Sequence, residues 1–244
     1  MSIIILPLQH ADVAACAKMS GAAFLGDRHT ELKEHGKIPY DHAAKSVPRL
    51  HSYLDNHKVV AVKAVSEGTI VGHVEWVFRG LDADEIPYPD GCPERVPERD
   101  WEAGGEKGNG EGEEEKENDE GLKLLANITD GNMTDMMTNL MPSGTRCMFI
   151  VGLTVDPQHQ RRGVGKALLK YGTNIADSLG LMVWVHSSQG ALPAYASAGF
   201  KPFAKLEVVL DEFAAGPPPE GGLWGSYAWQ WMWYHPNGTR PFRK

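Results

Sequence analysis

Seven short runs of apolar residues stand out along this chain, each bounded by glycine, proline or small polar residues. Their content of valine, isoleucine and aromatic residues is typical of β-strands. The predicted strands lie at residues 3–6, 57–65, 69–78, 147–155, 181–187, 203–210 and 226–234. The first is expected to be short and buried, and Ser66-Glu67-Gly68 predicts a hairpin between the second and the third.

Other segments repeat apolar residues every three to four positions, which predicts amphipathic helices. Asp12 is placed to cap the first helix, Pro48 is expected to bend the second, and Gly180 and Gly199 end two later ones. The predicted helices lie at residues 12–25, 41–56, 163–179 and 191–198. Residues 122–141 are also amphipathic and predict one helix or two short ones, which either pack on the body or cover a ligand cleft.

Charge is concentrated in one segment of the chain. The net charge is −8, yet residues 82–120 alone contain 16 acidic and four basic residues. The remainder is mildly basic, which leaves room for an anionic ligand. We interpret residues 80–145 as an acidic insertion whose low-complexity centre, about residues 101–121, is expected to be disordered. This insertion is either a solvated loop or a device that attracts a cationic amine or a basic protein tail.

Cysteine and histidine usage argues against disulfide and metal chemistry. The three cysteines are far apart, neither CxxC nor HExxH spacing occurs, and we expect no protein-bound metal. No apolar run approaches the ~18 residues that a membrane helix needs, and the first residues lack the pattern of a signal peptide. A cytoplasmic protein is expected, with the nucleus as the alternative, and with no membrane or nucleic-acid partner.

A basic glycine pair opens the helix predicted after the fourth strand. Gly163 and Gly165 lack a Cβ, so an anion can approach the first helical amides closely, and Arg161, Arg162 and Lys166 add positive charge. The spacing is that of neither GxxxxGK[ST] nor GxGxxG. It predicts a cradle for a pyrophosphate, and the simpler alternative is a basic helix start with two turn glycines.

Two motifs in this order resemble the GNAT superfamily of N-acetyltransferases. The run Gln160-Arg161-Arg162-Gly163-Val164-Gly165 matches the superfamily's Q/R-x-x-G-x-G/A signature and follows a Leu-x-Val-x-Pro segment. Farther along, Tyr195-Ala196-Ser197-Ala198-Gly199-Phe200 resembles its Y-x-x-x-G-F helix. The order of the predicted elements also fits, so the resemblance covers nearly the whole chain except about residues 80–145.

The resemblance implies an α/β protein of the GNAT fold. A single domain, residues 1–244, would contain a mixed, mostly antiparallel twisted sheet of about seven strands with helices on both faces. The strands that end near Val155 and Ser187 would splay apart, and acetyl-CoA would insert between them as a co-substrate. The residues implied to bind it are Leu153, Thr154 and Val155 through their backbone, the cradle Gln160, Arg161, Arg162, Gly163, Val164, Gly165 and Lys166, and Ser188.

The resemblance also implies how the reaction proceeds. A backbone amide near Leu153 would polarise the thioester carbonyl, and the amine would attack directly in a ternary complex. Tyr195 would protonate the departing thiolate, with packing in the core as its alternative role. The predicted strand at 147–155 has no acidic residue, so Glu75, beside His73 on one face of its strand, is the candidate base. A solvated polar face is the alternative for this pair, and packing is favoured for His186.

The acceptor cannot be identified from these patterns. Trp229, Trp231 and Trp233 share one face of the last strand, which indicates either a face covered by helices or an aromatic acceptor pocket. A small-molecule primary amine is the expected acceptor. A protein lysine or N-terminus, or an acyl-CoA sensor without catalysis, are the alternatives, and the protein is expected to be a monomer or a homodimer.

Overall fold

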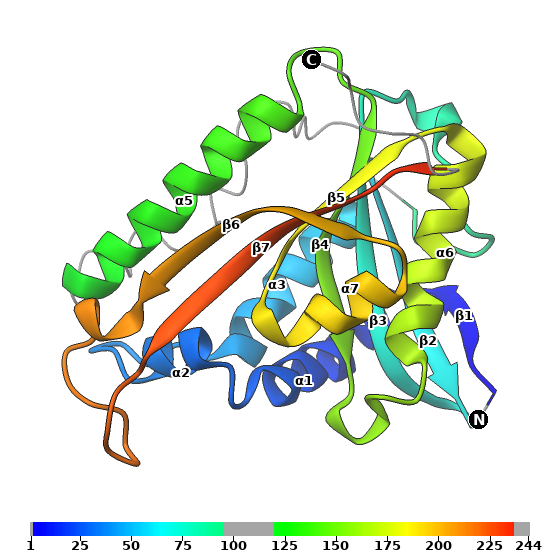
Figure 1. The fold of residues 1–244 in the computed structure, drawn as a ribbon. Helices are drawn as coiled ribbons and strands as arrows, with labels where there is room; N and C mark the ends of the chain where they lie inside the picture. The colour runs from blue at the N-terminus through cyan, green and yellow to red at the C-terminus, as the bar shows by residue number, and fades with distance from the viewer. Residues whose placement is uncertain (1, 95–119, 237–244) are drawn as a thin grey trace.

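A seven-stranded mixed sheet forms the centre of the protein, with helices on both of its faces (Figure 1). The computed structural model describes residues 2–94 and 120–236. The strands, in chain order, are β1 (Ile4–Pro7), β2 (Val59–Ser66), β3 (Thr69–Arg79), β4 (Cys147–Val155), β5 (Met182–Ser187), β6 (Lys201–Val209) and β7 (Ser226–Tyr234). They lie side by side in the order β1-β2-β3-β4-β5-β7-β6, and of these neighbours only β4 and β5 run parallel.

Six α-helices in the described residues accompany the sheet. They are α1 (Val13–Phe24), α2 (Arg28–Glu34), α3 (His42–Asp55), α5 (Glu120–Leu140), α6 (Val164–Leu179) and α7 (Leu192–Ser197). The α/β class, the sheet and every predicted strand and helix are therefore confirmed, with ends that agree within two residues. None of the helices is both long and apolar enough to cross a membrane, as far as the described residues go.

One helix was not predicted, and two local expectations were wrong. The helix α2 was not predicted, although Asp27 caps it by accepting from the Thr30 amide at 3.0 Å. The strand β1 is not buried, because it forms an edge of the sheet and leaves the Leu6 side chain 42% exposed. The Asp12 carboxylate does not cap α1 but accepts from the Gln9 amide and the Lys63 ammonium.

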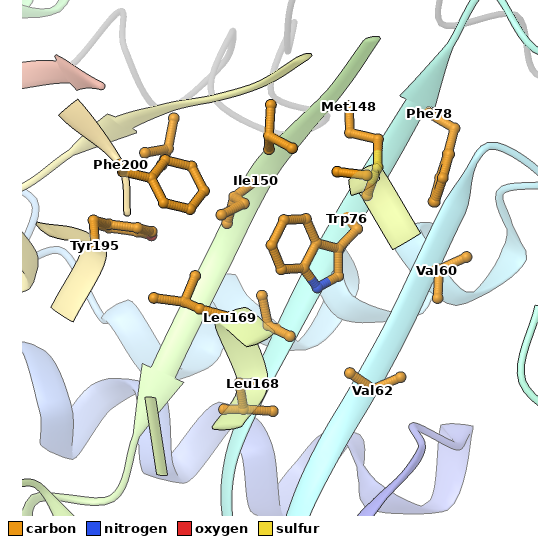
Figure 2. Packing of buried hydrophobic residues seen from close by; sticks show 14 of the residues in the cluster. Val60, Val62, Trp76, Phe78, Met148, Ile150, Leu168, Leu169, Tyr195 and Phe200 are labelled. Atoms are coloured by element: carbon orange, nitrogen blue, oxygen red, sulfur yellow. The ribbon is translucent and has the colours of Figure 1, made fainter. Parts of the chain in front are cut away.

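Two apolar clusters hold the helices on opposite faces of the sheet. One joins α6 and α7 to the strands, and Figure 2 shows Trp76 of β3 lying beside Leu168 and Leu169 of α6. The other cluster joins α1 and α3 to the opposite face of β2–β5 and β7. Gly172 allows the close approach of α6, since a Cβ there would lie 2.2 Å from the indole ring of Trp76.

Both described ends of the predicted insertion pack on the body. Leu81 and Ile86 are buried in the cluster with α6, and α5 is one helix whose Leu122 and Leu125 are buried against β7. The Trp231 indole donates to Asn132 of α5 at 3.0 Å. Because α5 begins at Glu120, the expected disorder is wrong for residues 120 and 121, and the rest of the low-complexity centre, residues 101–119, lies outside the described part of the chain.

The packing of α6 can be tested with two glycine substitutions in helices. Gly172→Ala places a methyl group against the fully buried Trp76, and we expect a loss of about 1–3 kcal/mol in the free energy of unfolding. Gly131→Ala in α5 is the control, because a Cβ there meets nothing within 4 Å and should stabilise the helix slightly. Urea unfolding measures both, and a Gly172→Ala variant as stable as wild type would contradict the packing.

Candidate active site

The parallel strands β4 and β5 separate part of the way along their length. Their pairing runs from Cys147 opposite Met182 to Ile150 opposite Val185 and stops there, whereas β4 remains paired with β3 as far as Val155. At that point β4 contains one extra residue, because Trp76 and Glu75 of β3 face Ile150 and Gly152. This β-bulge bends β4, and no described strand pairs with its β5-facing edge beyond Ile150.

A cavity of about 260 Å³ lies where the two strands separate. Its walls are the ends of β4 and β5, the start of α7, the segment from α1 to α3, and β7. Six of its lining residues were named from the sequence, which are Leu153, His186, Ser187, Ser188, Tyr195 and Trp229. The structure therefore brings Leu153, Ser188 and Tyr195 together with one of the three tryptophans. The predicted site residues that do not line this cavity are Glu75, Thr154, Val155 and residues 160–166.

The glycine pair opens α6 next to the end of β4, where an added Cβ on Gly165 would lie 3.6 Å from the Val155 side chain. Gly163 is the N-cap residue at φ +88°, and the first i to i−4 bond in the helix runs from the Ala167 amide to its carbonyl. The amides of the preceding turn have no partner within the helix. A Cβ on Gly163 would meet nothing within 4 Å, so the helix start is open on that side.

Cationic side chains surround this open helix start. Arg161, Arg162 and Lys166 are all exposed, and Arg161 has a left-handed φ of +62° that turns the chain into the helix. The side-chain amide of Gln160 donates to the backbone carbonyl of Val155 at 3.3 Å and connects the loop to the end of β4. Open amides at the positive end of a 16-residue helix, beside three cations, suit a bound pyrophosphate.

A buried polar network lies on the α1 side of the same strands. His73 Nδ1 is 2.7 Å from Glu75 Oε1, and His73 Nε2 is 3.3 Å from the hydroxyl of Ser20, which is also 3.3 Å from the Thr154 hydroxyl. All four side chains are buried, so the alternative of a solvated face for His73 and Glu75 is wrong. An ideal Cβ at Gly152, which lines the cavity, would lie 2.2 Å from Glu75 Oε2.

Tyr195 reaches the cavity from α7. Its ring packs edge-on against Phe200 at 5.4 Å between centroids, and Figure 2 shows the two rings beside Ile150 of β4. Burial raises the pKa of Tyr195 far above its ordinary value, and the negative charge of Glu75 raises that pKa further. The phenol therefore keeps its proton at every ordinary pH. Tyr195 both packs in the core and lines the cavity.

One side of the cavity is rich in aromatic rings. Trp229 lines it, whereas Trp231 donates to Asn132 of α5 and Trp233 stacks on Phe203 at 4.4 Å. The prediction of an aromatic acceptor pocket can therefore apply only to Trp229 among the three tryptophans. His29 and Tyr227 also line the cavity and were not predicted as site residues. The cap residue Asp27 is the signal that would have located α2 and, with it, His29.

None of the described residues forms a group of three or more His, Cys, Asp or Glu side chains that could hold a metal ion. The arrangement instead offers an anion cradle, an open strand edge, a buried carboxylate and a protonated phenol. Together these groups can bind an extended ligand with a charged end and move protons at its other end.

Three solved structures illustrate the similarity of the fold. A polyamine N-acetyltransferase of Drosophila melanogaster has a TM-score of 0.54 at 15% identity, covering 96% of this chain and 100% of that one. A histone acetyltransferase HPA2 and related acetyltransferase of Corynebacterium glutamicum has a TM-score of 0.52 at 17% identity, covering 99% of each chain. The protein smu.2055 of Streptococcus mutans has a TM-score of 0.50 at 14% identity, covering 95% and 98%.

Among curated proteins, a sequence comparison finds no match. The profile of the Acetyltransferase (GNAT) family, however, matches residues 27–200. That range contains the open helix start, both separated strands, Glu75 and Tyr195. The match extends over more than half of the chain, and this protein therefore belongs to the acetyltransferase (GNAT) family.

Proposed function

We propose that this protein transfers an acetyl group from acetyl-CoA to the primary amine of a small molecule, by direct attack in a ternary complex. The observation that carries this proposal is the separation of β4 and β5 after Ile150 and Val185. It joins an anion cradle, an unpaired strand edge and a cavity that contains Tyr195 and borders Glu75. The family membership supports acetyl transfer as the chemistry.

Acetyl-CoA would lie along the open edge of β4. Its pyrophosphate would bind at Gly163 and the neighbouring cations, and its pantetheine amides would pair with the backbone of residues 153–155 like an added strand. Ser188, which follows β5 and lines the cavity, would contact the opposite side of the ligand. The thioester would then reach the cavity near Gly152 and Leu153, where a backbone amide can stabilise the oxyanion.

Three proton transfers complete the reaction. The acceptor ammonium first loses a proton to Glu75, and its free lone pair attacks the thioester carbon. The carbon–sulfur bond then breaks, and sulfur keeps the electron pair and takes a proton from Tyr195. The amide nitrogen releases the second ammonium proton, which returns to Tyr195 through solvent. The products are the N-acetyl amine, free CoA and the proton held by Glu75.

The contacts of Glu75 suit the role of a base. Because a carboxylate only accepts hydrogen bonds, His73 Nδ1 carries the proton in the 2.7 Å contact and leaves Nε2 to accept from Ser20. This arrangement fixes Glu75 Oε1 and leaves Oε2 under Gly152, next to the cavity. We propose His73 as the residue that positions Glu75.

Two other functions are alternatives, and the assay described below distinguishes them from the proposed one. A protein lysine or N-terminus is less favoured, since the described cavity holds only about 260 Å³ and is walled by side chains from several elements. A sensor that binds acyl-CoA without catalysis is less favoured because it has no need for a buried carboxylate and a protonated phenol on either side of the strand gap.

Release of free CoA tests the proposed function directly. With acetyl-CoA and a panel of small primary amines, we expect amine-dependent appearance of the CoA thiol and an N-acetyl product seen by mass spectrometry. Peptides with a lysine or a free N-terminus are measured in parallel. CoA binding without turnover of any amine or peptide would indicate the sensor, and turnover of peptides alone would indicate a protein-modifying enzyme.

The cradle predicts that Gly163→Val weakens CoA binding at least about tenfold, since the branched side chain would occupy the place of the pyrophosphate. Gly180→Val at the other end of α6 is the matched control. That glycine also has a positive φ, +67°, and no atom within 4 Å of an added Cβ, so the backbone strain is comparable. Calorimetry measures the CoA affinity of both variants. Equal affinities would show that the pyrophosphate of CoA does not bind at Gly163.

Tyr195→Phe keeps the ring and removes only the proton. We expect kcat to fall by about 10², the low end of general acid catalysis, because a thiolate is a tolerable leaving group. Since burial holds the pKa of Tyr195 far above its ordinary value, the pH profile should keep its shape. Tyr171→Phe in α6, which packs on the same core outside the cavity, is the control and should retain wild-type kcat. Wild-type turnover by Tyr195→Phe would show that another group supplies the proton.

A further inference from the structure

A connected group of rings forms the acceptor wall of the cavity. His29 of α2 stands edge-on to Trp229 at 4.8 Å, and Tyr227 lies 4.7 Å from the same indole. His186, at the end of β5, is nearly parallel to that indole at 6.1 Å. All four residues line the cavity, and we call them the ring cluster.

The ring cluster is electrically neutral at physiological pH. Burial lowers the pKa of His29 to about 3 and that of His186 to about 4. The pKa of Tyr227 is raised by burial and by the neighbouring Asp27, so its hydroxyl stays protonated. No member of the cluster therefore carries charge when the enzyme works near pH 7.

Only two charged residues line the described cavity, and both are engaged by other groups. Asp27 Oδ1 accepts from the amide and the hydroxyl of Thr30, both at 3.0 Å, and its Oδ2 accepts from Tyr227 at 2.7 Å. The ammonium of Lys33 lies 4.4 Å from the centre of the Tyr40 ring. A ligand with a second ammonium would lose its hydration here without gaining a dedicated carboxylate.

We infer that the acceptor is a compact amine with an aromatic ring, which packs against the ring cluster while its amino group points toward Gly152. This inference rests on the proposed function and names the class of its substrate. Ring edges and faces attract one another, and an enclosed neutral wall stabilises a flat apolar body more than a flexible polycation. The space of about 260 Å³ suits one ring with a short amino side chain.

The first test compares substrates on the full-length enzyme. With acetyl-CoA as donor, kcat/KM for 2-phenylethylamine, tyramine or tryptamine should exceed that for spermidine or agmatine by at least about tenfold. A preference for the polyamines overturns the inference and leaves the proposed function intact. Turnover of peptides alone overturns both the inference and the small-molecule acceptor of the proposed function. If no amine at all releases CoA, the proposed function is wrong and the inference falls with it.

The second test changes the ring cluster itself. Trp229→Leu should raise KM for the aromatic amine about 10- to 100-fold, with an unchanged KM for acetyl-CoA, because the ring contact is lost. Trp233→Leu, on the same face of the same strand but stacked on Phe203 outside the cavity, should leave both values unchanged. Equal values of KM for the amine in wild type and Trp229→Leu would contradict the ring contact.

A further variant keeps the inference testable if Trp229→Leu folds poorly. His29→Asp puts a carboxylate into the neutral wall, and the ratio of kcat/KM for spermidine to that for 2-phenylethylamine should rise at least about tenfold. Because this ratio is measured on one preparation, it does not depend on the fraction of folded enzyme. An unchanged ratio would show that the ring cluster does not face the acceptor.

Discussion

The extra residue at Val151 is the constraint from which the geometry of the site follows. It lies where β4 stops pairing with β5 but continues along β3, so β4 turns away from one neighbour while the other holds it in the sheet. The turn leaves a backbone edge whose hydrogen-bonding groups require partners other than a strand. It also brings Gly152 over Glu75, where the missing Cβ leaves room for the carboxylate. The extra residue in β4 thus accounts for the cavity, for the open strand edge and for the position of Gly152 next to the candidate base Glu75.

The two sides of this opening impose different electrostatics on the same ligand. Toward α6 the positive charges are exposed and the helix amides are open, which suits a phosphate that remains in contact with water. Toward α1 the carboxylate of Glu75 is buried and bonded to His73. Its charge also helps to keep the proton on Tyr195. Tyr195 therefore begins the proposed reaction in the protonated form that an acid needs.

Features that depend on neighbours in the sequence could be predicted, and features that depend on the order of strands could not. The glycine pair at 163 and 165 and the turn after Ser66 follow from local backbone requirements, and the structure has both. Alternation placed His73 and Glu75 on one face, but only the packing of α1 shows that this face is buried. The exposure of β1 follows from its place at the edge of the sheet. The ring cluster is formed by residues from α2, β5 and β7, so no local pattern indicates it.

The helix α5 follows the acidic part of the chain and packs against the ring cluster. Trp229 and Tyr227 belong to the apolar cluster that contains Leu122 and Leu125, so α5 supports these rings from the side away from the cavity. In Figure 1, α5 lies along β6 and β7, the two strands at this edge of the sheet. An indole held by a helix behind it and by a neighbouring strand loses little further freedom when a ligand packs against it. The acidic segment, whose composition differs from the rest of the chain, is therefore followed by a helix that packs against two members of the ring cluster.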